Sequence, residues 1–284
     1  MPMPHNDHVL GGELPVARLG FGAMHLTDSW VRDPPADRAA AIGVARRAVE
    51  LGVTFIDTAD SYGLGANEEL LAEALHPYPR ELVIGTKAGQ SRPSRDEWVP
   101  LGRPEYLRQQ AELSLRRLRV ERIDLYQLHR LDPLVPAEDQ FGALKQLQDD
   151  GKIGHIGLSE VTVEELDLAR TVVEVVSVQN LYNLTDRRHD PVLDYCAAEG
   201  LAFIAWLPIA AGAHSRVSGP LARIAAETGA TPAQVSLAWL LHRSPVMVAI
   251  PGTSSAAHLA ENVRAADLKL TDEQYASLSA IPPR

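Results

Sequence analysis

The chain has very little cysteine, with Cys196 alone among 284 residues. One cysteine excludes an internal disulfide, and a protein without disulfides suits the reducing cytoplasm. The surrounding sequence, LDYCAAEG, predicts a helix that ends at Gly200. We expect Cys196 to be packed and unreactive there, because a buried thiol behaves as a small hydrophobe.

Features that direct a protein to membranes or nucleic acid are also lacking. No run approaches the roughly 18 apolar residues that a spanning helix needs, and residues 1–12 lack the basic and apolar regions of a signal peptide. The net charge is −10, without a long basic run. Nucleic acid and anionic membranes are therefore poor partners, and we expect a cytoplasmic protein, either a monomer or a weak homo-oligomer.

Two common enzyme signatures are missing as well. The nearest pattern to GxGxxG is GFGAM at residues 20–24, which lacks the third glycine and the helix start of a dinucleotide-binding turn. No HxH pair follows the first expected strand, and the histidines are scattered. The sequence therefore argues against a metal-dependent barrel hydrolase, and we predict no metal site.

Short apolar runs alternate with amphipathic stretches almost from end to end. Strict alternation predicts a parallel sheet, and eight strands with a helix each would close it into a (β/α)8 TIM barrel. An open doubly wound sheet is the alternative. We expect residues 1–284 to form one domain, with strands at 18–24, 53–58, 81–87, 122–129, 152–159, 175–180, 201–208 and 246–252.

Local signals predict where several helices begin and end. Asp37, Asn67 and Thr162 are expected helix starts, and Thr162 with Glu165 has the spacing of a capping box. The expected C-terminal caps are the glycines Gly52, Gly151 and Gly200.

Two segments depart from the simple alternation. Residues 9–10 and 14–17 around Gly11-Gly12 predict a β-hairpin, which could cover the lower mouth of the barrel. Residues 209–220 are small and glycine-rich, which predicts a flap over a bound ligand. Two helical patterns follow at 218–229 and 231–243, where one helix would be the norm.

Four polar residues stand where expected strands give way to loops: Asp57, Tyr62, Lys87 and His129. The C-terminal ends of barrel strands are where such enzymes carry their active sites. An acid, a phenol, an amine and an imidazole gathered there can protonate a carbonyl oxygen. The arrangement predicts an enzyme, although each residue taken alone is more often structural.

Seven motifs stand at the expected strand ends, in barrel order and over nearly the whole chain: FGAM (21–24), FIDTADSYG (55–63), TKAG (86–89), LHR (128–130), GLSE (157–160), VQNLYN (178–183) and IPGTSSAAHLAEN (250–262). These motifs resemble those of the aldo-keto reductases. The motifs GLSE and IPGTSSAAHLAEN are similar to those of bacterial members, including pyridoxal-reductase-like ones. The resemblance implies reduction of aldehydes and ketones by a nicotinamide dinucleotide that is bound without a Rossmann unit.

By this resemblance Tyr62 donates the proton that the developing alkoxide needs. An ordinary phenol is a weak acid at neutral pH, and an ammonium beside it, that of Lys87, would lower its pKa. Asp57 would keep Lys87 charged and in position. His129 could donate a hydrogen bond to the carbonyl oxygen and orient it.

The resemblance also implies a cofactor site across the barrel mouth. Ser159 and Gln179 match residues that bind the nicotinamide carboxamide, Trp206 matches the aromatic that stacks on the ring, and Leu207 and Ile209 would offer backbone groups to the pyrophosphate. Thr253 and Ser254 would form an anion site at a helix N-terminus. The other positions assigned to the cofactor are Gly22, Met24, Asp57, Gly252, His258, Glu261 and Asn262.

Three positions depart from the family pattern. Glu160 stands where many members have Asn, Gly252 where many have Lys, and His258 where many have Arg. The loss of two permanent cations should weaken contacts to an adenosine 2′-phosphate. We expect NADPH as cofactor, with NADH as the alternative, and we assign Glu160 no role.

The substrate side is less well defined by the sequence. Tyr62, His129 and Trp30 are the expected substrate contacts, and Trp98 is a weaker candidate. The chain ends soon after a last helical pattern, which favours an open pocket and a range of small aldehydes. A cofactor-binding sensor module of the same fold, with little turnover, is the rival interpretation.

Overall fold

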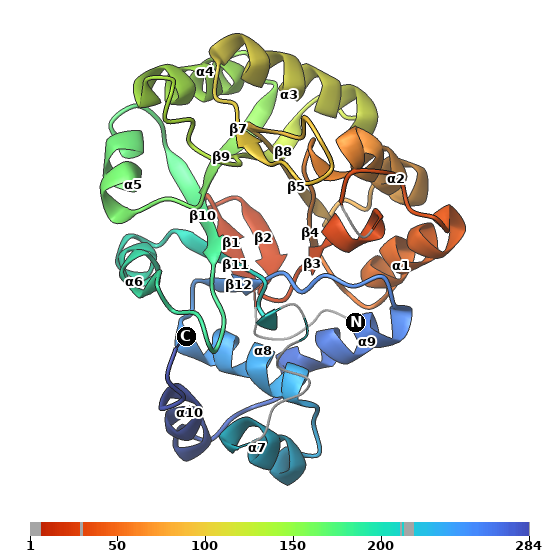
Figure 1. Ribbon diagram of the computed structural model, residues 1–284, viewed down its shortest axis with the longest axis vertical. Helices are drawn as coiled ribbons and strands as arrows, with labels where there is room; N and C mark the ends of the chain where they lie inside the picture. The colour runs from red at the N-terminus through yellow and green to blue at the C-terminus, as the bar shows by residue number, and fades with distance from the viewer. Residues whose placement is uncertain (1–6, 29–30, 211, 213–218, 284) are drawn as a thin grey trace.

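The computed structural model describes residues 7–28, 31–210, 212 and 219–283. Parallel strands alternate with helices, and the helices surround the strands on the outside (Figure 1). The strands of the main sheet are β3 (Phe21–Gly22), β4 (Phe55–Asp57), β5 (Val83–Ala88), β8 (Ile123–Leu128), β9 (Ile153–Ser159), β10 (Val175–Leu181), β11 (Ala202–Trp206) and β12 (Met247–Ala249).

These eight strands pair in parallel, in the order β12-β11-β10-β9-β8-β5-β4-β3. A parallel bridge between Leu19 and Ala249 joins the two ends of the sheet. At the same place the N–H of Gly20 donates to the carbonyl of Ala249 at 2.9 Å, and the N–H of Ala249 donates to the carbonyl of Arg18 at 2.8 Å. The sheet closes into a barrel, as the alternation predicted, and the open doubly wound sheet is excluded.

The helices lie close to their expected positions. The two expected between residues 218 and 243 are both present, and with α10 they form a group on one side of the barrel (Figure 1). The helices are α1 (Arg38–Glu50), α2 (Ala66–Leu75), α3 (Pro104–Leu118), α4 (Ala137–Asp149), α5 (Val163–Arg170), α6 (Asp190–Glu199), α7 (Pro220–Thr228), α8 (Pro232–Arg243), α9 (Ala256–Arg264) and α10 (Asp272–Ser279); the 3₁₀ segments are η1 (Ala23–Leu26), η2 (Tyr62–Gly65) and η4 (Ala265–Asp267).

Two of the three predicted helix starts are confirmed. Asp37 caps α1, and Thr162 forms the capping box of α5 with Glu165. The prediction for Asn67 is wrong, because Gly65 is the N-cap of α2 and Asn67 lies inside its first turn, fully buried. Its amide bonds Thr58 Oγ1 at 2.6 Å and the carbonyl of Ala23 at 2.8 Å, so tertiary contacts engage the side chain.

The N-terminal hairpin is present as predicted, with β1 (Asp7–Leu10) antiparallel to β2 (Leu14–Ala17). A second, short hairpin joins β6 (Gln90–Ser91) to β7 (Val99–Pro100). Leu10 and Val16 pack into the barrel interior against strand residues such as Phe55 and Leu125. The first hairpin therefore covers one mouth of the barrel and leaves the other for a site.

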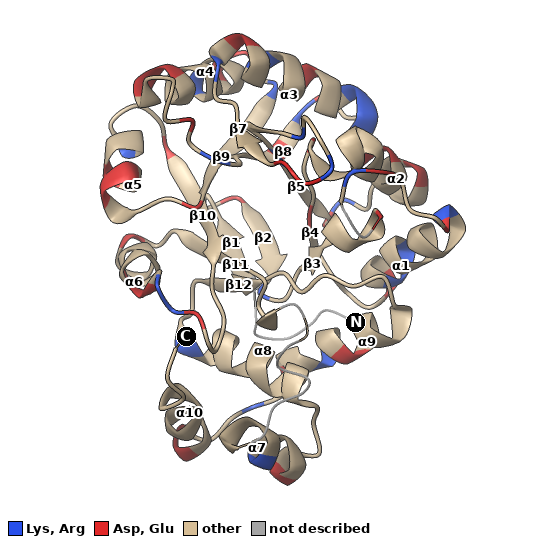
Figure 2. Cartoon of the chain, in the orientation of Figure 1, with Lys and Arg blue, Asp and Glu red and all other residues tan. Residues whose placement is uncertain are grey.

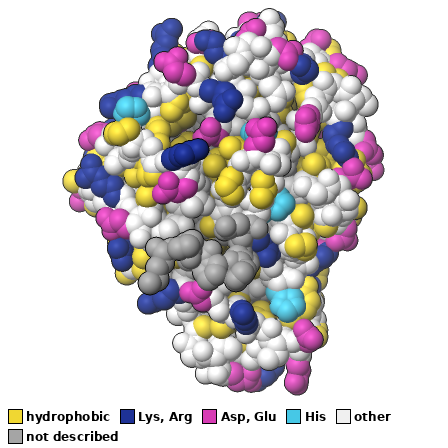
Figure 3. Space-filling view, turned by 180° about the vertical axis from the view of Figure 1, so that it is seen from behind, with side chains coloured by type: hydrophobic (Ala, Val, Ile, Leu, Met, Phe, Trp, Pro, Cys, Tyr) yellow, Lys and Arg dark blue, Asp and Glu magenta, His cyan; other side chains and the backbone are white. Residues whose placement is uncertain are grey.

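Charged side chains lie mainly on the outer helices and loops, and the strands carry few (Figure 2). On the face seen in Figure 3, acidic and basic side chains are interspersed around hydrophobic patches. None of the helices in the described part of the chain is long and apolar enough to cross a bilayer.

Candidate active site

The four polar residues singled out in the sequence meet at the C-terminal ends of neighbouring strands. Asp57 ends β4, Lys87 lies near the end of β5, and His129 directly follows β8. Tyr62 begins η2, five residues after Asp57. Because β4, β5 and β8 are adjacent in the sheet, their carboxyl ends bring these side chains together.

Lys87 is the centre of this cluster and has no exposed surface. Its Nζ lies 2.6 Å from Asp57 Oδ2, 2.8 Å from the carbonyl of Thr58 and 3.3 Å from the Tyr62 hydroxyl. An ammonium has three donors, and these contacts use all three. The geometry holds the amine against the phenol.

The second carboxylate oxygen of Asp57 is bound by two amides. Gln127 and Gln179 each donate from Nε2 to Asp57 Oδ1, at 3.0 and 2.8 Å. The sequence analysis assigned Gln179 to the nicotinamide, and in the structure its amide nitrogen donates to the Asp57 carboxylate. Gln127 was missed in the sequence, although a polar residue inside the apolar run of β8 was a signal for it.

Burial reverses the expected shift of the Tyr62 pKa. Desolvation raises the pKa of the phenol, and Asp57 raises it further, while Lys87 lowers it as predicted. The net direction is upward, so the sequence prediction of a lowered pKa is wrong in this state. Tyr62 is therefore fully protonated at neutral pH, which is the form that can donate a proton.

The pKa values of Lys87 and His129 are shifted in opposite directions. Burial disfavours the ammonium, but the carboxylate of Asp57 and the hydrogen bonds to Asp57 and Tyr62 outweigh burial and raise the pKa of Lys87 above its ordinary value. Burial lowers the pKa of His129 well below its ordinary value, and the cations Lys87 and Arg130 lower it further. His129 is therefore a neutral imidazole, and its Nδ1 lies 3.4 Å from Ser61 Oγ.

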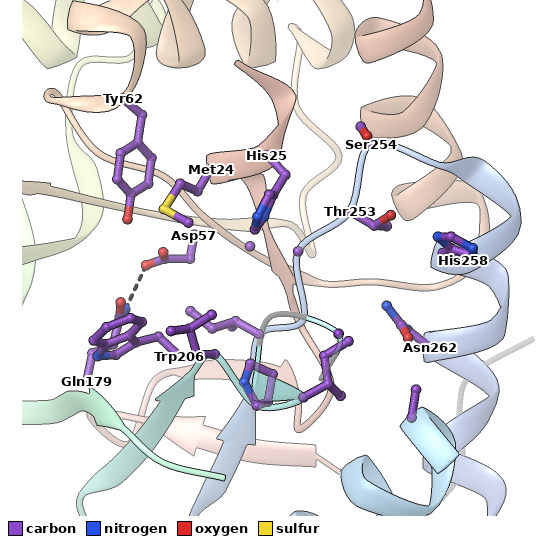
Figure 4. Close-up of a pocket in the computed structure, with 18 of the residues that line it drawn as sticks. Met24, His25, Asp57, Tyr62, Gln179, Trp206, Thr253, Ser254, His258 and Asn262 are labelled. Atoms are coloured by element: carbon purple, nitrogen blue, oxygen red, sulfur yellow. Dashed lines mark hydrogen bonds between the residues drawn. The ribbon is translucent and has the colours of Figure 1, made fainter. Parts of the chain in front are cut away.

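A cavity of about 880 Å³ opens beside this cluster, within the range of ligand pockets. Figure 4 shows Tyr62, Asp57, Gln179 and Trp206 at one end, Met24 and His25 in the middle, and the segment of Thr253, Ser254, His258 and Asn262 at the other. The predicted residues that line it are Gly22, Met24, Asp57, Tyr62, His129, Ser159, Gln179, Trp206, Leu207, Ile209, Gly252, Thr253, Ser254, His258, Glu261 and Asn262.

Some predicted residues lie elsewhere. Lys87 does not line the cavity but contacts Tyr62, which does. Trp30 lies outside the described residues, as does most of the segment expected to form a flap. Trp98 lines the cavity, with its ring 6.4 Å from those of Tyr62 and His129. Wall residues that the sequence did not single out include His25, Gln90, Arg130 and Thr231.

The end of the cavity at α9 has a helix N-terminus. The cap is Ser255, whose hydroxyl accepts from the N–H of His258, and Thr253 Oγ1 accepts from the N–H of Ser255 at 3.1 Å. Thr253 and Ser254 therefore precede the cap rather than form it. An anion is favoured at such a terminus.

Gly252 cannot simply be exchanged for the lysine of the family pattern. A Cβ at this position would lie 2.7 Å from Nδ1 of His25 and 2.8 Å from the carbonyl of Gly22. Backbone at that distance has to move to admit a side chain. The ring of His25 lies where a longer side chain would begin, so a Gly252→Lys exchange is not a clean test of cofactor preference.

Comparison with known proteins agrees with this fold. Residues 18–282 match the sequence model described as the Aldo/keto reductase family, and the chain belongs to that family of oxidoreductases. It is 48% identical over 267 residues to an uncharacterized oxidoreductase of Schizosaccharomyces pombe, covering 94% of this chain and 87% of the relative.

The chain is also similar to an enzyme with a named activity and to a solved structure. The chain is 41% identical over 285 residues to pyridoxine 4-dehydrogenase of Escherichia coli, covering 98% of this chain and 99% of that enzyme. It superposes on an aldo-keto reductase from Klebsiella pneumoniae in complex with NADPH with a TM-score of 0.85 at 26% identity, covering 99% of this chain and 97% of that one.

Proposed function

We propose that the protein reduces a small aldehyde or ketone with NADPH, with Tyr62 as proton donor. The observation that carries this proposal is the buried contact between Lys87 Nζ and the Tyr62 hydroxyl at the wall of the cavity. Family membership and the NADPH complex of the Klebsiella pneumoniae structure support the choice of reaction and cofactor. We also propose that residues 1–284 act as one domain.

The cavity fits an extended dinucleotide. It offers a flat indole, Trp206, at the end near Tyr62, and a helix N-terminus at the other end for a phosphate. We assign the nicotinamide to Trp206, Ser159 and Gln179, and the pyrophosphate to the backbone of Leu207 and Ile209. The remaining cofactor contacts are proposed at Gly22, Met24, Asp57, Gly252, Thr253, Ser254, His258, Glu261 and Asn262.

A nicotinamide held by Trp206, Ser159 and Gln179 would supply the hydride that the carbonyl carbon needs. Tyr62 donates its proton to the carbonyl oxygen, and the fixed ammonium of Lys87 stabilises the phenolate that remains. We propose that the Ser61 hydroxyl, 3.4 Å from Nδ1 of His129, donates to that nitrogen and leaves the ring proton on Nε2. That N–H orients the carbonyl oxygen. In the reverse direction the same groups remove the proton of an alcohol.

The substrate is proposed to be a small aldehyde. Trp98 and His129 frame the space next to Tyr62, which suits a planar or aromatic aldehyde. The relative named pyridoxine 4-dehydrogenase supports including pyridoxal in a panel of small aldehydes used as test substrates. The panel is run with NADPH and with NADH, since Gly252 and His258 leave no permanent cation at their positions.

Tyr62→Phe tests the proposal. Removal of one oxygen should lower the turnover of pyridoxal or nitrobenzaldehyde on the order of 10²–10⁴-fold, the contribution of a positioned acid. NADPH binding, followed by fluorescence titration, should stay nearly unchanged. Tyr78→Phe is the matched control, because the Tyr78 hydroxyl is bonded to the carbonyl of Leu118 away from the cavity.

Near-normal turnover of the Tyr62→Phe protein would refute the assignment of the proton donor. A wild-type protein that binds NADPH tightly but turns over no aldehyde of the panel would favour the sensor module instead. Failure of the wild type to bind either dinucleotide would remove the proposed function altogether.

A further inference from the structure

Glu160 has an unusual backbone conformation for its residue type. It directly follows Ser159 at the end of β9, with φ at 56°, in the left-handed region. Its N–H donates to the carbonyl of Gln179 at 3.0 Å. Asparagine, the residue of the family pattern, tolerates this region better than glutamate does. The backbone therefore gives no reason for glutamate, and its contribution has to come from the side chain.

The carboxylate of Glu160 binds the indole of Trp206. Its Oε1 accepts from Trp206 Nε1 and from the N–H of Leu181, both at 2.6 Å, and its Oε2 lies 3.6 Å from His189 Nε2. Burial alone would raise the pKa of this carboxyl, but the hydrogen bonds from His189, Trp206 and Leu181 lower it to about 2. Glu160 is therefore fully ionised at neutral pH.

A cation lies over the ring of the same indole. The guanidinium of Arg130 is 6.0 Å from the centre of the Trp206 ring and lines the cavity. Its Nη1 donates to Ser159 Oγ at 3.0 Å and to the carbonyl of His129 at 2.6 Å. The charges of Glu160 and Arg130 act on each other. The indole, the wall proposed to face the nicotinamide, thus has a negative charge at its N–H and a positive charge over its ring.

We propose that Glu160 is a positioning residue that fixes Trp206 and offsets the charge of Arg130, and so sets the relative affinity of the site for oxidised and reduced cofactor. The inference rests on the proposed function. The oxidised nicotinamide ring carries a positive charge and the reduced ring carries none. A carboxylate near the ring favours the oxidised form, and an uncompensated guanidinium disfavours it.

Glu160→Gln separates charge from geometry. The amide oxygen can still accept from Trp206 Nε1 and Leu181 N–H, so the indole keeps its place while the negative charge is lost. The measurement is the pair of dissociation constants for NADP⁺ and NADPH by titration calorimetry. Their ratio, oxidised over reduced, should rise on the order of threefold to tenfold, as expected for one partly screened charge.

The Arg130→Gln variant should change the ratio of the two dissociation constants in the opposite direction. Loss of the cation should lower the same ratio, by a factor of similar size. Glu160→Ala removes both the charge and the bond to the indole, so it should weaken both cofactors in addition to shifting the ratio. Thermal unfolding of each variant verifies that it is folded.

The outcomes are distinguishable from a failure of the proposed function. An unchanged ratio in Glu160→Gln, with both cofactors bound, overturns the charge effect and leaves the reaction in place. A ratio that moves in the same direction in Glu160→Gln and Arg130→Gln also overturns it. If the wild type binds neither dinucleotide, the inference and the proposed function both fall.

Discussion

The active-site cluster contains a buried ion pair between Lys87 and Asp57. Lys87 has no exposed surface, and Asp57 is only 2% exposed. Their contact at 2.6 Å is completed by hydrogen bonds to the remaining oxygens and protons. Buried pairs of this kind contribute modestly as pairs, but the loss of one partner is costly because it leaves an unpaired charge in the interior.

Asp57→Asn should therefore lower the free energy of unfolding by about 3 kcal/mol. The double variant Asp57→Asn/Lys87→Met should lose less than the sum of the two single variants, since it leaves no charge unpaired. Denaturant titration of the four proteins gives the cycle. Strict additivity would contradict a direct interaction between the two charges.

The pH dependence of stability has a defined sign at Lys87. Against the effect of burial, Asp57 and Tyr62 raise the folded-state pKa of Lys87 above its ordinary value of 10.5. The ion pair therefore contributes its full stability below pH 10.5 and loses it as the pH rises through the folded-state pKa. Denaturant titrations repeated at increasing pH measure this effect. The Lys87→Met protein should not show the loss of unfolding free energy at alkaline pH.

At this scale the sequence predicted which residues come together better than it predicted their pKa values. Asp57, Tyr62, Lys87 and His129 were expected at one end of the barrel because a polar residue after an apolar run marks a strand end, and the structure brings them together. The direction of the Tyr62 pKa was missed, because it depends on how far burial exceeds the influence of Lys87. Gln127 and Arg130 were missed because their roles depend on which strands are neighbours in the barrel.

At the scale of elements, α2 shows how tertiary contacts override a local signal. The sequence pattern favours Asn67 as a helix cap, but Gly65 fills that position with φ at 94°. The side chain of Asn67 instead connects Thr58, next to Asp57, with the carbonyl of Ala23 in η1, a segment on the cavity wall. Through Asn67, helix α2 connects the loop after β4 with η1.

Asn67→Ala should cost about 2–3 kcal/mol of unfolding free energy, since it leaves buried polar partners unsatisfied. Asp37→Ala, the loss of an ordinary exposed cap, should cost about 1 kcal/mol. Both can be measured by denaturant unfolding. Equal losses in the two variants would mean that Asn67 acts as no more than a cap.

Element positions were predicted well where the signal is local. The capping box of Thr162 and Glu165 and the helix ending at Gly200 depend only on nearby residues, and both are confirmed. Strand β4 is shorter than its apolar run, because strand length depends on the neighbours that pair with it.

At the scale of the whole molecule, the alternation of eight strands with helices predicted a barrel but left an open sheet as the alternative. The sequence could not show the contact that decides between them, because the bridge from Leu19 to Ala249 joins segments 230 residues apart. The barrel places the hairpin β1–β2 at one mouth and the candidate site at the other. Barrels commonly separate stability from reaction in this way.

This separation predicts that the hairpin can be weakened without loss of the site. Leu10 is 1% exposed and packs in the barrel interior, whereas Val9 beside it is 46% exposed. Leu10→Ala should lower the unfolding free energy by about 3 kcal/mol, and Val9→Ala by less than about 0.5 kcal/mol. NADPH affinity at a temperature where both variants are folded should equal that of the wild type. A weakened affinity in Leu10→Ala alone would show that packing at the covered mouth extends to the candidate site, against the division of the barrel into two independent ends.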